Sequence, residues 1–105
     1  MILDEQKLII QKYKDGFCLA ILMPDNTCHY LHTDLQMGIN DVLICRDILL
    51  DQELLSNDIT VSQDDGYFRL NINLKDANGM MYLFHSRKLS LSDMIYQRSL
   101  LVKAD

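Results

Sequence analysis

The stretch ITVSQDDGYFRLNINL, residues 59 to 74, restricts the fold of this chain more than any other. Two runs of alternating apolar and polar residues flank Asp65-Gly66, a pair typical of the two-residue turn of a β-hairpin. Such a turn pairs Asp64 with Tyr67 and so fixes the partners along the hairpin. The face that becomes apolar holds Ile59, Val61, Phe68, Leu70, Ile72 and Leu74. The sequence therefore predicts an antiparallel sheet with one face against a core.

A second pair of strands is predicted in FCLAILMPDNTCHYLHT. Two apolar runs, residues 17–23 and 28–33, flank the turn-forming residues Pro-Asp-Asn-Thr. The first run is apolar on both faces, which is typical of a central strand covered on both sides.

Helices are expected at both ends of the chain. Residues 3–14 contain good helix formers with early acids at Asp4 and Glu5, and Asp15-Gly16 provides a stop. Near the C-terminus, Ser90 and Asp93 resemble a capping box. The apolar stripe expected on this second helix consists of Leu91, Met94, Ile95, Leu101 and Val102.

Two segments leave alternatives open. Residues 42–45 (VLIC) are predicted as a short strand, followed by a helix that Asp47 caps and Asn57 ends. The competing interpretation is one helix across residues 41–56, but its polar positions scatter around the helical wheel.

The strand MMYLFHS, residues 80–86, has an inward face that depends on the length of the preceding turn. A two-residue loop turns Met81, Leu83 and His85 inward. A three-residue loop ending in Gly79 turns Met80, Tyr82 and Phe84 inward.

These predictions combine into one α+β domain over residues 1–105, with the order α-β-β-β-α-β-β-β-α. We expect an antiparallel sheet of about five or six strands with the N- and C-terminal helices packed on it. A chain of 105 residues, 49% of them hydrophobic, is large enough to bury a core of its own.

The stretch TCHYLHTD contains the residue types of a metal site or a thiol nucleophile. On a strand, however, Cys28 and His32 are about 13 Å apart, and His29 and His32 point to opposite faces. Zinc ligands must lie much closer together. Motifs such as GxGxxG, GxSxG or HExxH are also missing from the sequence. We therefore expect no metal, no cofactor and no catalytic residues.

The acidic residues are concentrated in one third of the chain. The net charge is −5 overall, but residues 34–66 hold one basic residue, Arg46, against eight acids, a net charge of −7. The eight acids are Asp34, Asp41, Asp47, Asp51, Glu53, Asp58, Asp64 and Asp65. Such a segment argues against a nucleic-acid partner, which needs a basic face, and favours a basic protein partner.

The function expected from these features is that of a non-enzymatic immunity or inhibitor protein, which neutralises a basic toxin such as a nuclease. The partner-binding residues are expected to be Asp47, Asp51, Asp58, Asp64, Asp65 and Tyr67. A cytoplasmic monomer is expected. The N-terminus MILDEQK lacks a signal peptide, the three cysteines (Cys18, Cys28 and Cys45) include no CxxC pair, and no apolar run is long enough for a membrane helix.

The predicted order of elements also resembles that of the class I type III secretion chaperones, which have a helix, three strands, a helix, two strands and a helix. The resemblance covers most of the chain and includes no specific motif, and this chain is short for the group and has an additional strand. It implies a homodimer that binds an effector protein. A small enzyme with an unrecognised site is the remaining alternative.

Overall fold

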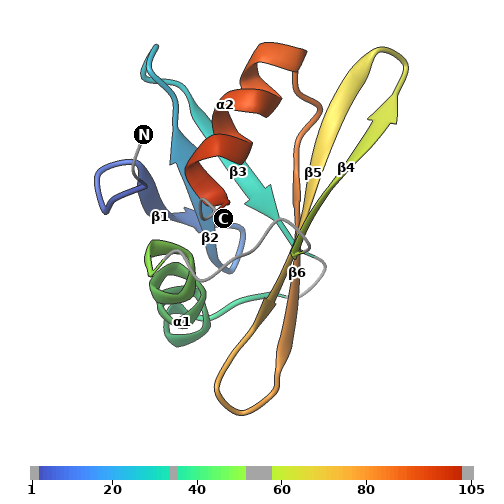
Figure 1. Ribbon diagram of the computed structural model, residues 1–105. Coiled ribbons are helices and arrows are strands. Elements are labelled where there is room, and N and C mark those ends of the chain that lie inside the picture. Colours follow the sequence, from blue (N-terminus) through green and yellow to red (C-terminus); the bar gives the residue numbers. More distant parts are fainter. Residues whose placement is uncertain (1–2, 34–35, 52–57, 103–105) are drawn as a thin grey trace.

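Within the described part of the chain, six antiparallel strands and two α-helices follow one another in the order β-β-β-α-β-β-β-α (Figure 1). The computed structural model describes residues 3–33, 36–51 and 58–102. The elements are β1 (Leu8–Tyr13), β2 (Gly16–Leu22), β3 (Cys28–His32), α1 (Ile39–Leu50), β4 (Ile59–Asp64), β5 (Tyr67–Lys75), β6 (Met81–Ser86) and α2 (Leu91–Leu101). The expected α+β class with a helix-covered antiparallel sheet is confirmed.

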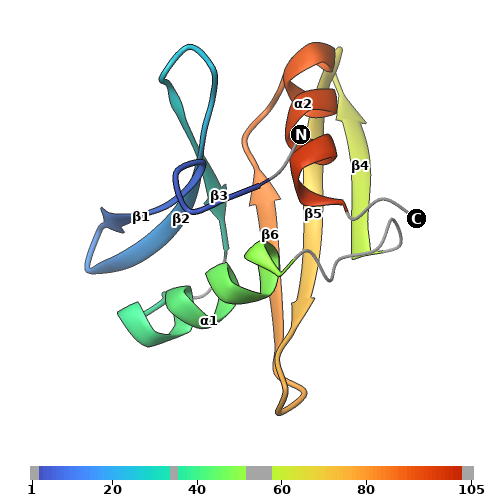
Figure 2. The ribbon, with the colours of Figure 1, turned by 60° about the vertical axis from the view of Figure 1, so that its left-hand side comes forward.

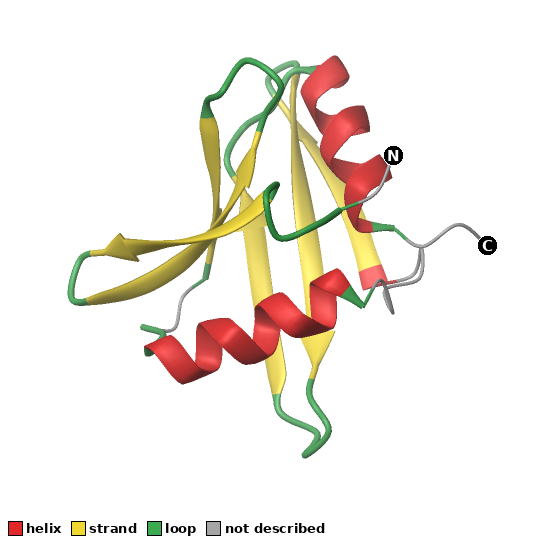
Figure 3. Ribbon diagram, turned by 90° about the vertical axis from the view of Figure 1, so that its left-hand side faces the viewer, coloured by secondary structure: helices red, strands yellow, loops and turns green. Residues whose placement is uncertain are grey.

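The sheet consists of two three-stranded meanders joined at one seam. Its strand order is β1-β2-β3-β6-β5-β4, and the seam lies between β3 and β6. Among the residues that the structure describes, two pairs form the seam, Leu31 with Ser86 and His32 with His85. Because the seam is so short, the sheet can twist strongly there, and the β1–β2 hairpin is turned away from β4, β5 and β6 (Figures 2 and 3).

The β4–β5 hairpin has the register that the sequence predicts. Asp64 pairs with Tyr67, Val61 with Leu70, and Ile59 with Ile72. Asp65 and Gly66 both have positive φ angles, 50° and 81°, which is the requirement of a type I′ turn. Turn chemistry and alternation specify the same register, and the turn and the register are confirmed. Val61, however, is 42% exposed on the edge strand β4, so its predicted place on the core face is wrong.

The predicted N-terminal helix over residues 3–14 is wrong, because residues 8–13 form β1. The capping signal at Asp4 acts over a single turn: its carboxylate accepts hydrogen bonds from the backbone N–H groups of Gln6 and Lys7. The chain then pairs with β2 over six residue positions, from Leu8 with Ile21 to Tyr13 with Gly16. A central strand that is apolar on both faces needs a neighbour on each edge, and this outweighs the helix propensity of the segment.

The predicted strand at residues 42–45 is also wrong, because these residues lie within α1, so the single-helix alternative is correct for the described part. Val42, Cys45 and Leu49 form the buried side of α1. Asp47 is in the last turn of the helix and not at its N-cap, which is Gly38. The expected stop at Asn57 lies outside the described residues.

In β6, Tyr82 and Phe84 are the inward residues, as the longer-loop alternative predicts, while Met81 and Leu83 are exposed. Met80 lies before the strand and is exposed, so its inward placement is wrong. The register pairs Lys75 with Met81, which leaves residues 76–80 for the turn. The turn is therefore longer than either alternative assumed.

Both helices cover the same face of the sheet and share one core. Buried residues of α1 and α2 form a single cluster with inward side chains of the strands. The buried stripe of α2 consists of Met94, Gln97, Leu100 and Leu101. Leu91 and Ile95 are exposed, so their assignment to the apolar stripe was wrong. None of the helices in the described ranges has the length and apolar character needed to cross a bilayer.

At Gly16, two backbone segments come so close that only glycine fits. The N–H group of Phe17 donates a 3.0 Å hydrogen bond to the carbonyl oxygen of Met37, which lies where β3 would continue beside β2. A Cβ atom on residue 16 would lie 2.6 Å from that oxygen. The close approach therefore anchors the segment that leads into α1.

We predict that Gly16→Ala destabilises the protein by about 1–3 kcal/mol, because the added methyl group forces the backbone of Met37 away. Thermal unfolding should show a fall in Tm of roughly 4–8 °C for each kcal/mol. Gly38→Ala is the matched control, because its new Cβ would have 4.0 Å of room and its φ of −78° suits alanine. Equal stability of the two variants would contradict the prediction.

Candidate functional site

The structure divides the expected partner-binding residues between two places. Asp64, Asp65 and Tyr67 lie at the turn of the β4–β5 hairpin, whereas Asp47 and Asp51 lie at the C-terminal end of α1. Figures 1 and 3 show this hairpin turn and α1 at opposite ends of the molecule. The described acids at the C-terminal end of α1 and at the hairpin turn therefore lie on separate surfaces.

At the hairpin turn, part of the acidic charge is neutralised within the chain. The Asp64 carboxylate lies 3.8 Å from the ammonium group of Lys88. Both side chains are exposed, so the pair contributes little to stability. Tyr67 is exposed beside the turn, and Asp58 is half-buried directly before β4. Asp34 and Glu53 lie outside the described residues.

Helix α1 presents a second surface, here called the α1 outer face: Asn40, Leu43, Ile44, Asp47 and Asp51. All five are exposed, and their spacing of three or four residues per step places them on one side of the helix. The opposite side packs on β1 and β2. The α1 outer face is therefore both acidic and apolar.

The one basic residue of α1 is turned away from this face. The guanidinium group of Arg46 donates hydrogen bonds to the carbonyl oxygens of Leu8 (2.9 Å) and Glu5 (3.0 Å). The last turn of α1 contains no basic side chain. Asp47 and Asp51 have no ion-pair partner within residues 3–33, 36–51 and 58–102. Their negative charges are therefore available to attract a positively charged partner.

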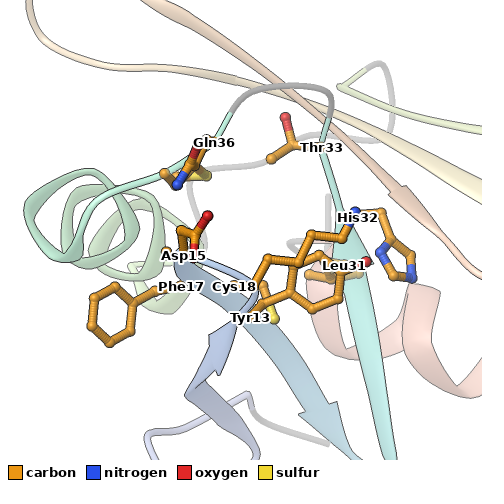
Figure 4. Close-up of a pocket in the computed structure, with 11 residues that line it drawn as sticks. Tyr13, Asp15, Phe17, Cys18, Leu31, His32, Thr33 and Gln36 are labelled. Atoms are coloured by element: carbon orange, nitrogen blue, oxygen red, sulfur yellow. The ribbon is translucent and has the colours of Figure 1, made fainter.

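A cavity of about 330 Å³ opens where β3 leaves β2 to join β6. Its lining comes from the β1–β2 turn, the start of β2, the end of β3 and the segment before α1: Tyr13, Lys14, Asp15, Gly16, Phe17, Cys18, Leu31, His32, Thr33, Gln36 and Met37. Figure 4 shows Asp15 and Gln36 on one side of the space and Tyr13 and His32 on the other. The volume is that of a small-ligand pocket.

The aromatic side of this cavity is tightly packed. The ring of His32 lies 6.0 Å from Tyr13 and 6.1 Å from Tyr30, with both pairs edge-on, and the two tyrosine rings are 5.8 Å apart. The ammonium group of Lys14 lies 5.4 Å from the Tyr13 ring centre, within cation–π range. Burial raises the pKa of the Cys18 thiol, which therefore stays protonated at neutral pH and is a poor nucleophile.

The cysteine and histidines of TCHYLHTD are held apart by β3, as the strand prediction requires. Cys28 accepts a 3.7 Å hydrogen bond from the side chain of Gln11, while His29 is buried on the opposite, helix-covered face. No three His, Cys, Asp or Glu side chains come together as a metal site among the residues that the structure describes. His85, on the same face as His32, bonds to Asn71 (3.1 Å).

His29 belongs to a buried polar contact between β3 and α2. Its Nδ1 lies 2.7 Å from the Nε2 of Gln97, which as an amide nitrogen donates the hydrogen bond. The Oε1 atom of Gln97 is buried and has no hydrogen-bond partner among the described residues. Burial, followed by the nearby charge of Arg87, lowers the pKa of His29, and both effects favour the neutral ring.

The sequence does not identify Leu43 and Ile44 as surface residues. The polar positions of this segment scatter around the helical wheel, which argues against a helix there. In the structure, apolar residues of α1 form two sets: Val42, Cys45 and Leu49 in the core, and Leu43 and Ile44 in solvent. An apolar residue on the polar side of a helix was the available signal for a binding surface.

We predict that a thiol reagent modifies one cysteine rapidly in the native protein and all three after unfolding. All three cysteines are free, and Cys28 alone is not fully buried. Burial raises the pKa of Cys45 to about 12, which suppresses its reactive thiolate further. Mass spectrometry of the first product should place the label on Cys28. Faster labelling of Cys45 would contradict the packing of α1.

We predict that protonation of His29 destabilises the fold. Because the pKa of folded His29 is below its ordinary value of about 6.5, the unfolded chain binds this proton first. The contribution is complete above about pH 6.5 and is lost as the pH falls towards the lowered pKa. Urea unfolding of the wild type between neutral and mildly acidic pH should show this loss. His29→Gln, which does not titrate, should show less of it, and identical profiles would contradict the assignment.

Comparisons of this chain with models of protein families, with curated proteins and with solved structures find no match. The function proposed below is therefore argued from the geometry and charge described above.

Proposed function

We propose that the protein is a non-enzymatic protein-binding module, an acidic inhibitor or immunity protein that binds and neutralises a basic toxin such as a nuclease. The main support is the position of Asp47 and Asp51 at the C-terminal end of α1. The chain also has a net charge of −5, and its acids are exposed at two separate surfaces.

The position of these two acids is electrostatically unfavourable for folding. The carbonyl end of a helix carries partial negative charge, and an acid there costs about 0.3–1 kcal/mol at low ionic strength. No basic side chain in the last turn of α1 offsets this cost, and Arg46 is bonded to backbone carbonyl groups. Charges that oppose local stability are typical of residues retained for function.

A basic toxin is a partner that such charges suit. A nuclease binds phosphate groups in a basic cleft, and an acidic protein can occupy that cleft in place of the nucleic acid. Long-range attraction also speeds association, which benefits an inhibitor that must act before damage occurs. Location in the cytoplasm would place the inhibitor in the same compartment as the target of the toxin.

The secretion-chaperone alternative is weaker, because the N-terminal helix of the resemblance is replaced by β1. A chaperone of this class would be a homodimer, whereas an inhibitor of this size can act as a monomer. Light scattering of the purified protein separates the two.

We predict that Asp47→Asn with Asp51→Asn slows association with the partner several-fold and flattens its dependence on salt. Exposed charges act over a Debye length of about 8–10 Å at physiological ionic strength, so their removal reduces steering. The same change should leave Tm unchanged or raise it, because it removes unfavourable charge from the end of α1. Stopped-flow mixing with the toxin that co-purifies from the native host measures the rate.

Asp64→Asn with Asp65→Asn is the matched pair at the other surface, and Gly66 is retained so that the hairpin turn survives. A larger effect of this pair would place the contact at the hairpin turn. An acidic partner, or binding that does not respond to salt, would contradict the proposed function.

A further inference from the structure

The α1 outer face exposes two aliphatic side chains that are not part of the buried core. Leu43 is 40% exposed and Ile44 41%, although the buried side of the helix is already filled by Val42, Cys45 and Leu49. Asp47 lies one turn beyond Leu43, so an acid borders the apolar pair directly. Exposed aliphatic side chains next to charged residues are typical of a protein-binding site.

We propose that the α1 outer face is the docking site, and that its occupant is a protein surface with an apolar depression bordered by lysine and arginine side chains. Leu43 and Ile44 would enter the depression, and Asp47 and Asp51 would face the basic border. The inference rests on the proposed function and deepens it, because it names the surface and the complementary chemistry of the partner.

Charge complementarity favours a basic protein surface over a second copy of the chain or a membrane. Both titratable groups of the α1 outer face are carboxylates, and Arg46 contributes its charge on the far side, towards β1. A second copy of the chain docking by the same face would bring like charges together. An anionic membrane surface would repel the face for the same reason. A basic protein surface gains from both the charge and the apolar contact.

A second exposed apolar pair provides an internal control. Met81 and Leu83 on β6 are each 52% exposed on the sheet face opposite the helices. The cross-strand neighbours of this pair are Lys75 and Asn73, so the surface around it is not acidic. If a partner bound non-specifically to exposed apolar residues, substitutions in either pair would weaken binding. Binding at the proposed site predicts that only the substitutions in α1 weaken it.

The test uses two labelled synthetic peptides: an amphipathic helix of leucine and lysine, and the same peptide with glutamine in place of leucine. Fluorescence anisotropy measures their binding to the intact protein, and amide chemical shifts locate it. We expect the leucine-containing peptide to bind more tightly and to shift residues 39–51. Leu43→Gln with Ile44→Gln should weaken its binding roughly tenfold or more. Met81→Thr with Leu83→Thr should not.

Two results overturn the inference in different ways. If both peptides bind equally and only Asp47→Asn with Asp51→Asn weakens them, the apolar contact is wrong while the acid-steered function stands. If neither the acidic nor the apolar variants of α1 change binding, the docking site on α1 is wrong, and the proposed function then depends on the Asp64 and Asp65 pair at the hairpin turn. Circular dichroism of each variant shows that α1 remains folded.

Discussion

Two residue pairs across β3 and β6, Leu31 with Ser86 and His32 with His85, hold the two halves of the sheet together. So short a seam cannot stabilise the sheet by its hydrogen bonds alone, and the shared core under α1 and α2 must do so. Near this seam, a side chain satisfies a backbone group that the neighbouring strand does not pair. Where β6 leaves β5, the Ser86 hydroxyl accepts a 2.9 Å hydrogen bond from the N–H group of Leu70, which would otherwise be buried without a partner.

The divergence of β3 from β2 sets the position of the cavity and of the α1 outer face. As β3 turns away from β2, a gap opens that becomes the cavity, and the Met37 backbone closes its far side against Gly16. The chain then enters α1, which Arg46 ties to β1 through the carbonyl groups of Leu8 and Glu5. This attachment orients the helix, so the acidic and apolar α1 outer face points to solvent.

Stability and the proposed function make opposite demands on α1. A helix built for stability alone would carry basic residues in its last turn and polar residues on its outer side. This helix carries acids at its C-terminal end and aliphatic residues outside. His29 is a similar case inside the protein, because burial lowers its pKa and so favours the neutral ring. Both features make the stability of the fold depend on charge state and solution conditions.

The sequence by itself determined those parts of the fold that local chemistry specifies. The Asp65-Gly66 turn and the alternation around it fixed the β4–β5 register, and Ser90 fixed the start of α2, where its hydroxyl caps the N–H group of Asp93. Tertiary structure decided the rest. Residues 8–13 have acceptable helix propensity, but they became a strand because β2 required a partner on each edge. The positions of the acids were decided in the same way. Asp47 and Asp64 belong to the same acidic third of the sequence, but Asp47 lies in α1 and Asp64 ends β4. Figures 1 and 3 show α1 and the β4–β5 turn at opposite ends of the molecule. Distances between separate elements depend on the packing of the whole chain, which no local pattern encodes.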